Sequence, residues 1–264
     1  MKISKNRKAL DYGALMILVV AVSSLYLSYA ILVKSSEIHT SIGEFATGIY
    51  KTSQEADKIL FYIDESANLA STKAVYDLAK NGGFADNNCG KNGDYYLLNK
   101  QDVPSELCDK RIQENYLFYF NDDFKKYLKN NEIIPENNYD FFIEEKELRG
   151  IAAENLFFDI KLPKTEDKVG KYSVKPSFKV LLEKDLSDYE KINSIAKQIL
   201  SNCLEVDKQN ECVKTNSQVL NFKKEGDVFL FEYNTGFKSK FEKEDLKIKF
   251  ALKLPLIPLD VPEA

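Results

Sequence analysis

The sequence predicts an α+β protein: a single N-terminal transmembrane helix that continues as a long amphipathic helix, then a mainly antiparallel, β-rich head with short helices. Three observations predict this class. They are an uncharged apolar run near the N-terminus, a helical stripe of small and apolar residues after it, and short aromatic-rich segments beyond residue 115. With 44% hydrophobic residues and few Pro and Gly (7 and 11), the chain has ample material for a packed core.

The first element is an apolar segment, Tyr12–Val33, which contains no charged residue. About 20 apolar residues cross a hydrocarbon core of roughly 30 Å, so this segment is long enough to span a bilayer. Before it stand four basic residues and one acidic residue: Lys2, Lys5, Arg7, Lys8 and Asp11. Because positive charge resists translocation, we expect residues 1–11 to be a cytoplasmic stub, 12–33 a transmembrane helix and the remainder extracytoplasmic.

A cleaved signal peptide is an alternative, because Ser28-Tyr29-Ala30 has the small-x-small form of a signal-peptidase site. We favour a retained anchor in the cell membrane, since the apolar run is longer than a usual signal core and the helical pattern continues through this site. A buried helix of a soluble protein is a third interpretation.

The second element is an amphipathic helix over residues 34–80. Its apolar or small residues recur at steps of three, four or seven: Ile42, Phe45, Ile49, Ala56, Ile59, Ile63, Ala67, Ala70, Ala74 and Leu78. Asn81-Gly82-Gly83 then predicts the helix end. The alanines at 67, 70 and 74 permit close approach, either to the head's own sheet or to the same stripe of another copy by self-association.

The head is expected over residues 84–254. Strands are predicted at Tyr116–Phe120, Tyr139–Ile143, Leu156–Ile160, Ser177–Leu182 and Leu246–Leu254, and helices at Asp122–Lys129 and Asp185–Ser201. A hairpin is predicted to turn at Asn234-Thr235-Gly236. The order strand, helix, strand, strand occurs twice, over 115–163 and 177–255, as either a β-α-β-β duplication or a chance similarity. Residues 255–264 are expected to be a proline-rich, extended tail.

Four cysteines follow the apolar segment, Cys89, Cys108, Cys203 and Cys212, and they allow three pairings. We predict the nearest-neighbour pairs, Cys89–Cys108 and Cys203–Cys212, because each closes one loop. Zinc needs closely spaced Cys or His ligands, and the chain has a single histidine, His39. We therefore predict no metal and no cofactor.

Charge and composition argue against other functions. Of the 37 basic and 41 acidic residues, four basic and one acidic precede Val33, so the remainder carries about −7, which disfavours nucleic acid. The sequence contains no phosphate-binding glycine loop and no serine- or metalloprotease motif. The paired carboxylates Asp122/Asp123, Glu144/Glu145 and Glu244/Asp245 are more typical of helix starts and turns than of catalysis, so no catalytic residue is predicted. The loop Asp86–Asp94 has the alternating oxygen-bearing residues of calcium loops but lacks their closing glutamate, so a turn is preferred.

A basic leader, an uncharged helix that becomes amphipathic and a disulfide-bearing head together resemble the archaeal type IV pilin-like family with class III signals. Lys8-Ala9 followed by Leu10 resembles the family's processing site, and the resemblance covers mainly residues 1–80. It implies cleavage before Leu10 and helices that bundle into a filament. The expected function is thus a non-enzymatic, membrane-anchored surface protein with a structural, adhesive or assembly role. The alternatives are an anchored receptor head for a solute or partner and, third, an anchored hydrolase.

Overall fold

The computed structural model describes residues 7–86, 89–108, 111–164, 166–182, 185–203, 205–218, 220–238 and 245–254, with side chains described for 16–35 and from 42 onward. It is an α+β protein whose sheets are mostly antiparallel, as predicted. The chain divides into two compact units. The first unit comprises residues 1–58 with 157–174, and the second comprises 59–156 with 175–264.

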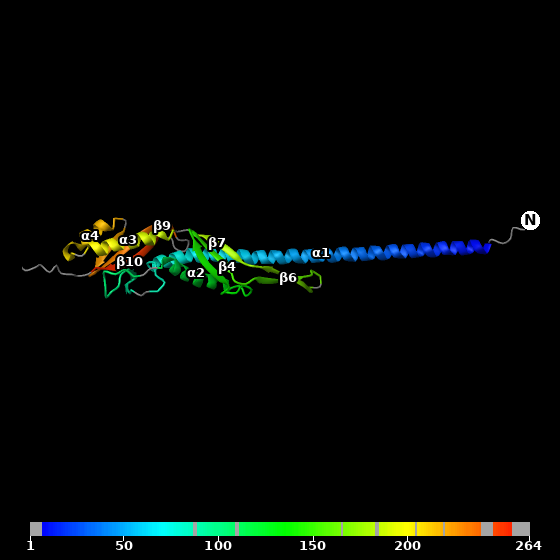
Figure 1. Cartoon of the computed structure of the whole chain (residues 1–264), viewed down its shortest axis with the longest axis horizontal. Coiled ribbons are helices and arrows are strands. Elements are labelled where there is room, and N and C mark those ends of the chain that lie inside the picture. The colour runs from blue at the N-terminus through cyan, green and yellow to red at the C-terminus, as the bar shows by residue number, and fades with distance from the viewer. Residues whose placement is uncertain are drawn as a thin grey trace, which may run out of the picture. The chain divides into compact units, whose positions relative to one another are not determined.

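Helix α1, Arg7–Lys80, is one unbroken helix of 74 residues, about 110 Å long at 1.5 Å per residue (Figure 1). The predicted continuation of the helix over 12–33 into the helix over 34–80 is therefore confirmed, with an earlier start. It ends at the predicted glycines, where Gly82 and Gly83 have φ of +63° and +92°. The Gly83 amide donates to the Leu78 carbonyl at 2.8 Å, as in a helix end closed by left-handed glycine.

In the first unit, strands β5 (Leu156–Lys161) and β6 (Lys168–Val174) form a two-stranded sheet that lies beside α1 (Figure 1). The two approach closely at buried Gly48, where a Cβ atom would lie 2.6 Å from the Lys161 carbonyl oxygen. Lys164 forms an ion pair with Glu44 of α1. Gly48 thus admits the hairpin to the helix surface without bending the helix.

The second unit contains the end of α1, helix α2 (Ile112–Leu128) and a three-stranded sheet of order β3-β4-β7. Its strands, β3 (Tyr139–Glu144), β4 (Glu147–Ala152) and β7 (Ser177–Leu181), pair antiparallel. Phe120 and Phe124 of α2 meet Phe178 of β7 with ring centroids 6.0 and 5.1 Å apart. This aromatic cluster is the core between α2 and the sheet.

The prediction of a strand at Tyr116–Phe120 is wrong, because these residues belong to α2. Tyr116, Phe120, Phe124 and Leu128 recur every four residues and are fully buried, so one helical face carries the aromatics. The helix predicted over Asp122–Lys129 is the second half of α2 and does not begin at the aspartates. Local β propensity was overridden by burial of this face.

The rest of the second unit is a five-stranded sheet of order β1-β2-β10-β9-β8 with further helices. The strands are β1 (Lys91–Asn92), β2 (Tyr95–Leu97), β8 (Asn221–Glu225), β9 (Val228–Lys238) and β10 (Asp245–Lys253). The helices are α3 (Ser187–Asn202), the short 3-10 helix η1 (Val206–Lys208) and α4 (Gln209–Asn216). β2 runs parallel to β10, whereas the other strand pairs of this sheet are antiparallel.

The hairpin predicted at Asn234-Thr235-Gly236 is also wrong, because β9 continues through these residues. The register with β10 shifts between Asp245 and Lys247, and the Thr235 hydroxyl donates to the Leu246 carbonyl at 2.7 Å. These turn-forming residues therefore lie at an irregularity within strand β9 and not in a hairpin turn. The tight turn lies earlier, at Gly226 between β8 and β9, and part of the predicted second strand lies outside the described residues.

The predicted β-α-β-β repeat is not matched by the element order. Residues 115–163 contain α2, β3, β4 and β5, whereas residues 177–255 begin with β7 and continue with α3, η1 and α4 before three strands. Because residues 116–120 belong to helix α2, the first predicted copy of the repeat lacks its initial strand. The predicted tail at 255–264 lies outside the described residues.

Candidate functional site

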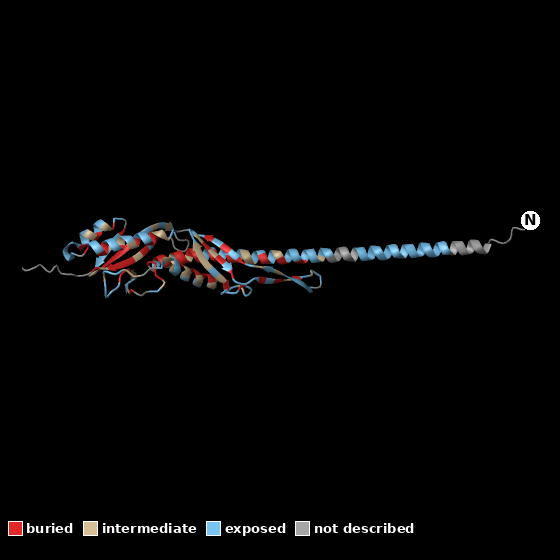
Figure 2. Ribbon diagram, viewed as in Figure 1, coloured by how far each residue is buried: buried red, intermediate tan, exposed pale blue. Residues whose placement is uncertain are grey.

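The apolar part of α1 is the first candidate. Met16–Ser35 is long and apolar enough to cross a membrane, and none of it is buried by the chain (Figure 2). Its serines donate to carbonyls of the same helix, Ser23 to Val20 at 3.0 Å and Ser28 to Ser24 at 2.8 Å. Their hydroxyls are therefore satisfied without water, as a lipid environment requires.

The predicted processing residues lie at the start of this helix. Lys8, Ala9 and Leu10 are helical, and their side chains lie outside the described part. The same holds for His39, which is also in α1. The processing site therefore stays a prediction.

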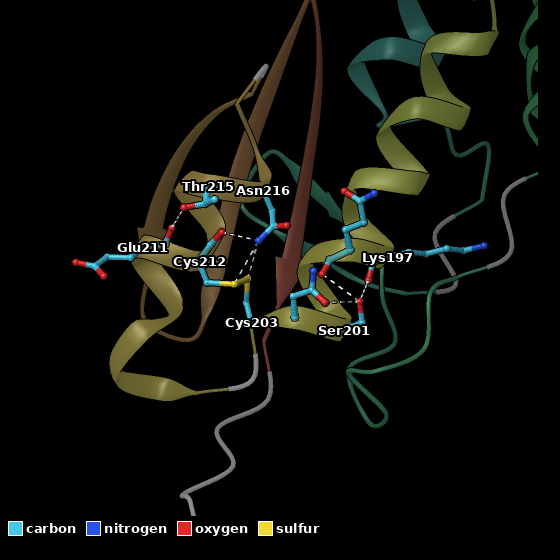
Figure 3. Close-up of a disulfide and its surroundings, with 9 residues drawn as sticks. Lys197, Ser201, Cys203, Glu211, Cys212, Thr215 and Asn216 are labelled. Carbon is cyan, nitrogen blue, oxygen red and sulfur yellow. Dashed lines mark hydrogen bonds between the residues drawn. A yellow bond between two sulfur atoms is a disulfide. The ribbon is translucent and has the colours of Figure 1, made fainter.

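Both predicted disulfides are present, Cys89–Cys108 and Cys203–Cys212, with Cα atoms 6.4 and 5.5 Å apart. In the second pair, the Asn216 amide donates to the Cys212 carbonyl at 2.8 Å and lies 3.4 Å from the Cys212 Sγ (Figure 3). Disulfides persist in oxidising compartments, which fits an extracytoplasmic location for this unit.

The alanine stripe of α1 lies inside the second unit. Ala67, Ala70 and Ala74 are fully buried, and the neighbouring Ser71 hydroxyl lies 2.7 Å from the Tyr116 hydroxyl of α2. The chain itself covers this stripe. In this fold, the alanines are therefore not a surface for self-association.

The paired carboxylates have structural partners where they are described. Asp122 and Asp123 both contact the Lys126 ammonium, at 2.6 and 3.2 Å, and Glu144 contacts the Arg149 guanidinium at 3.0 Å. Within the described residues, no three His, Cys, Asp or Glu side chains are grouped to hold a metal ion. Of the remaining pair, Glu244 lies outside the described residues.

A polar cleft of about 450 Å³ in the second unit is the second candidate. The end of α1, the β1–β2 hairpin and the start of β10 surround it. We call it the Lys91 cleft, and its polar lining residues are Tyr76, Lys80, Asn81, Lys91, Asp94, Tyr96, Asp245, Lys247 and Lys249. Asp245, from a predicted carboxylate pair, thus lies across from side chains more than 150 positions earlier in the chain.

Beside this cleft, side chains of β2, β9 and β10 form a small network of hydrogen bonds. Glu232 accepts from Lys247 at 2.9 Å and from the Tyr95 hydroxyl at 2.9 Å. Lys247 and, to a lesser degree, Tyr95 hold the pKa of Glu232 below its usual value, while burial and then Glu232 raise the pKa of Tyr95 to about 12. The Lys247 ammonium is therefore bound to Glu232.

A more open cleft lies between α1 and strands β4 and β7, lined by Phe61, Asp64, Glu65, Arg149, Ile151 and Lys179. On its sheet side, Glu147 contacts Lys179 at 2.6 Å and Arg149 at 3.1 Å, which lowers the Glu147 pKa. On its helix side, burial and then the Glu65 charge raise the pKa of Asp64. The basic groups are thus neutralised within the chain.

Sequence reasoning missed both clefts. Each is built from segments that are distant in the chain, and no local spacing of residues reports such a meeting. Gly93 does mark the β1–β2 turn, but a turn by itself predicts no ligand. In the comparisons with known proteins, no protein-family model, no curated protein and no solved structure matches this chain.

Proposed function

We propose that this chain is a single-pass membrane-anchored surface protein of the type IV pilin-like kind, with a structural, adhesive or assembly role outside the membrane. One observation carries the proposal: α1 runs without a break from an exposed apolar segment into the packed core of the second unit. The same helix therefore contains both the proposed anchor and part of the core of the head.

The exposed apolar side chains support an anchor. Leu18, Leu25 and Leu32 are 63–70% exposed, and apolar surface gains about 25 cal/mol per Å² on leaving water. The 20-residue segment Met16–Ser35 therefore needs apolar surroundings, and the described part of the chain does not provide them. Lipid is the cover in a membrane, and the same segment of neighbouring copies is the cover in a pilin-like filament.

Leu25→Arg tests the anchor. An arginine at the centre of a span costs roughly 2.5–3.5 kcal/mol on insertion scales, so we expect the variant to move from the membrane fraction toward the alkaline-carbonate supernatant. Phe61→Arg is the matched control, since Phe61 is 66% exposed in the same helix but belongs to the second unit. Wild-type protein released by carbonate would refute the anchor.

Processing and assembly need a separate measurement. N-terminal sequencing of protein from its native membrane should find Leu10 first, and sheared cell-surface material should contain the chain in filaments. Ala9→Leu should block the cleavage, whereas Ala14→Leu, inside the apolar run, should not. Uncleaved protein that is monomeric after extraction contradicts the pilin-like part of the proposal and leaves a plain anchored protein.

A receptor head is the second candidate function, and the Lys91 cleft is the observation that favours it. Its volume lies within the range of roughly 300–1,000 Å³ that is usual for small-molecule sites.

A further inference from the structure

Lys80 and Lys91 are two lysines of the Lys91 cleft that have no anionic partner among the described residues. Within the described part of the chain, neither the Lys80 nor the Lys91 ammonium has a carboxylate at ion-pair distance. Lys91 Nζ instead lies 3.9 Å from the centroid of the Tyr96 ring, where a cation–π contact places it against the cleft wall. The sequence after Val33 has a formal net charge of about −7. Two lysines without carboxylate partners are therefore opposite in sign to the net charge of this part of the chain.

Of the other two lysines of the cleft, Lys247 is ion-paired and, among the described residues, Lys249 is not. Lys247 donates to Glu232, and Lys249 Nζ lies 5.9 Å from the Tyr95 ring centroid. Within the described residues, the cleft lysines without an ion pair are therefore Lys80 from the last turn of α1, Lys91 from β1 and Lys249 from β10.

Hydrogen-bond acceptors share the same cleft. Asp94 and Asp245 contribute carboxylates, and Asn81 donates its amide to the Tyr119 hydroxyl at 2.7 Å, so its side-chain oxygen remains an acceptor. A bare anion such as sulfate offers these carboxylates no donor and is repelled by them. The cleft therefore matches a ligand that carries both a negative group and several hydroxyls.

We propose that the Lys91 cleft binds an acidic saccharide, namely a sugar chain with carboxylate groups of the uronic acid type. Lys80 and Lys91 receive the carboxylate, while Asp94, Asp245 and Asn81 accept hydrogen bonds from ring hydroxyls. The proposal gives the receptor or adhesive part of the function a ligand class. It does not depend on anchoring or filament assembly, because binding is measured on solubilised protein.

Calorimetry on the full chain in a polyoxyethylene detergent tests this, since maltoside detergents would themselves offer sugars. We expect tri-galacturonate to bind and neutral galactotriose to bind at least tenfold more weakly. Lys91→Met and Lys80→Met should each weaken tri-galacturonate binding about tenfold, because a charge-assisted hydrogen bond contributes about that factor. Lys223→Met is the control: Lys223 is exposed and paired with Glu225 at 2.7 Å, and it does not line the cleft.

Three outcomes overturn the proposal. Absence of millimolar tri-galacturonate binding, or equal loss in the Lys223→Met control, refutes the site. Sulfate that competes with tri-galacturonate at equal affinity refutes the saccharide and reduces the cleft to a general anion site. Asp94→Asn separates these cases further, since it should weaken a hydroxyl-bearing ligand but strengthen sulfate.

Discussion

The two ends of helix α1 are alike in conformation and opposite in environment. Met16–Ser35 carries large apolar side chains that the chain leaves uncovered, whereas Ala67–Ala74 includes three alanines that it buries completely. Large side chains suit a fluid cover such as lipid, while small ones let helix α2 approach, as the Ser71–Tyr116 contact shows. One continuous helix thus leaves its apolar side chains exposed at one end and buries its small side chains within the chain at the other.

The largest effect is expected from enlarging a buried alanine of this helix. Ala70→Leu adds three carbon atoms where the side chain is 0% exposed, so we expect a loss of about 1–3 kcal/mol in unfolding free energy. Ala46→Leu, the same change at an exposed position of α1, should leave that free energy nearly unchanged. Denaturant unfolding of solubilised protein measures both, and equal effects would contradict the difference between the two ends.

A smaller effect is expected at Gly43 and Gly48, two glycines of α1 in the first unit. Gly48→Ala places a Cβ against the Lys161 carbonyl and should loosen the β5–β6 hairpin, although alanine favours the helix by about 0.5–1 kcal/mol. A Cβ at Gly43 would have nothing within 4 Å, so Gly43→Ala should only stabilise the helix and should not disturb the β5–β6 hairpin. Amide hydrogen exchange over residues 157–174 should therefore accelerate in Gly48→Ala alone. Faster exchange in both variants would show that the glycines act through helix propensity.

The smallest effect is a pH dependence at Asp64. Burial and Glu65 raise its folded-state pKa above the ordinary value of 3.8, so the native state holds the proton more tightly than the unfolded state. The stability that this group contributes is therefore present at low pH and is lost as pH rises through the folded pKa. Asp64→Asn should flatten that part of the stability profile and slightly raise stability at neutral pH. Lower stability of the variant at neutral pH would indicate instead that ionised Asp64 has a stabilising partner.

Much of the fold follows from local patterns. Helix α1, both disulfides, helix α3 and strands β3, β5, β7 and β10 agree with the sequence-based elements to within a few residues. Helix α2 was misassigned because Tyr116 and Phe120 favour strands individually, while their four-residue spacing belongs to a helix. Strands β4, β6 and β8 were missed because charged residues and glycine interrupt their alternation, as in KVGKYSV.

The sequence alone determined the apolar segment, the long helix with its glycine stop and the two disulfides, because each depends on residues close together in the chain. Tertiary structure decided what covers the alanine stripe, how β9 passes through Asn234-Thr235-Gly236, and which lysines and aspartates line the Lys91 cleft. Those features depend on contacts between distant segments. Such contacts form when whole faces are buried together, and no local spacing of residues encodes them.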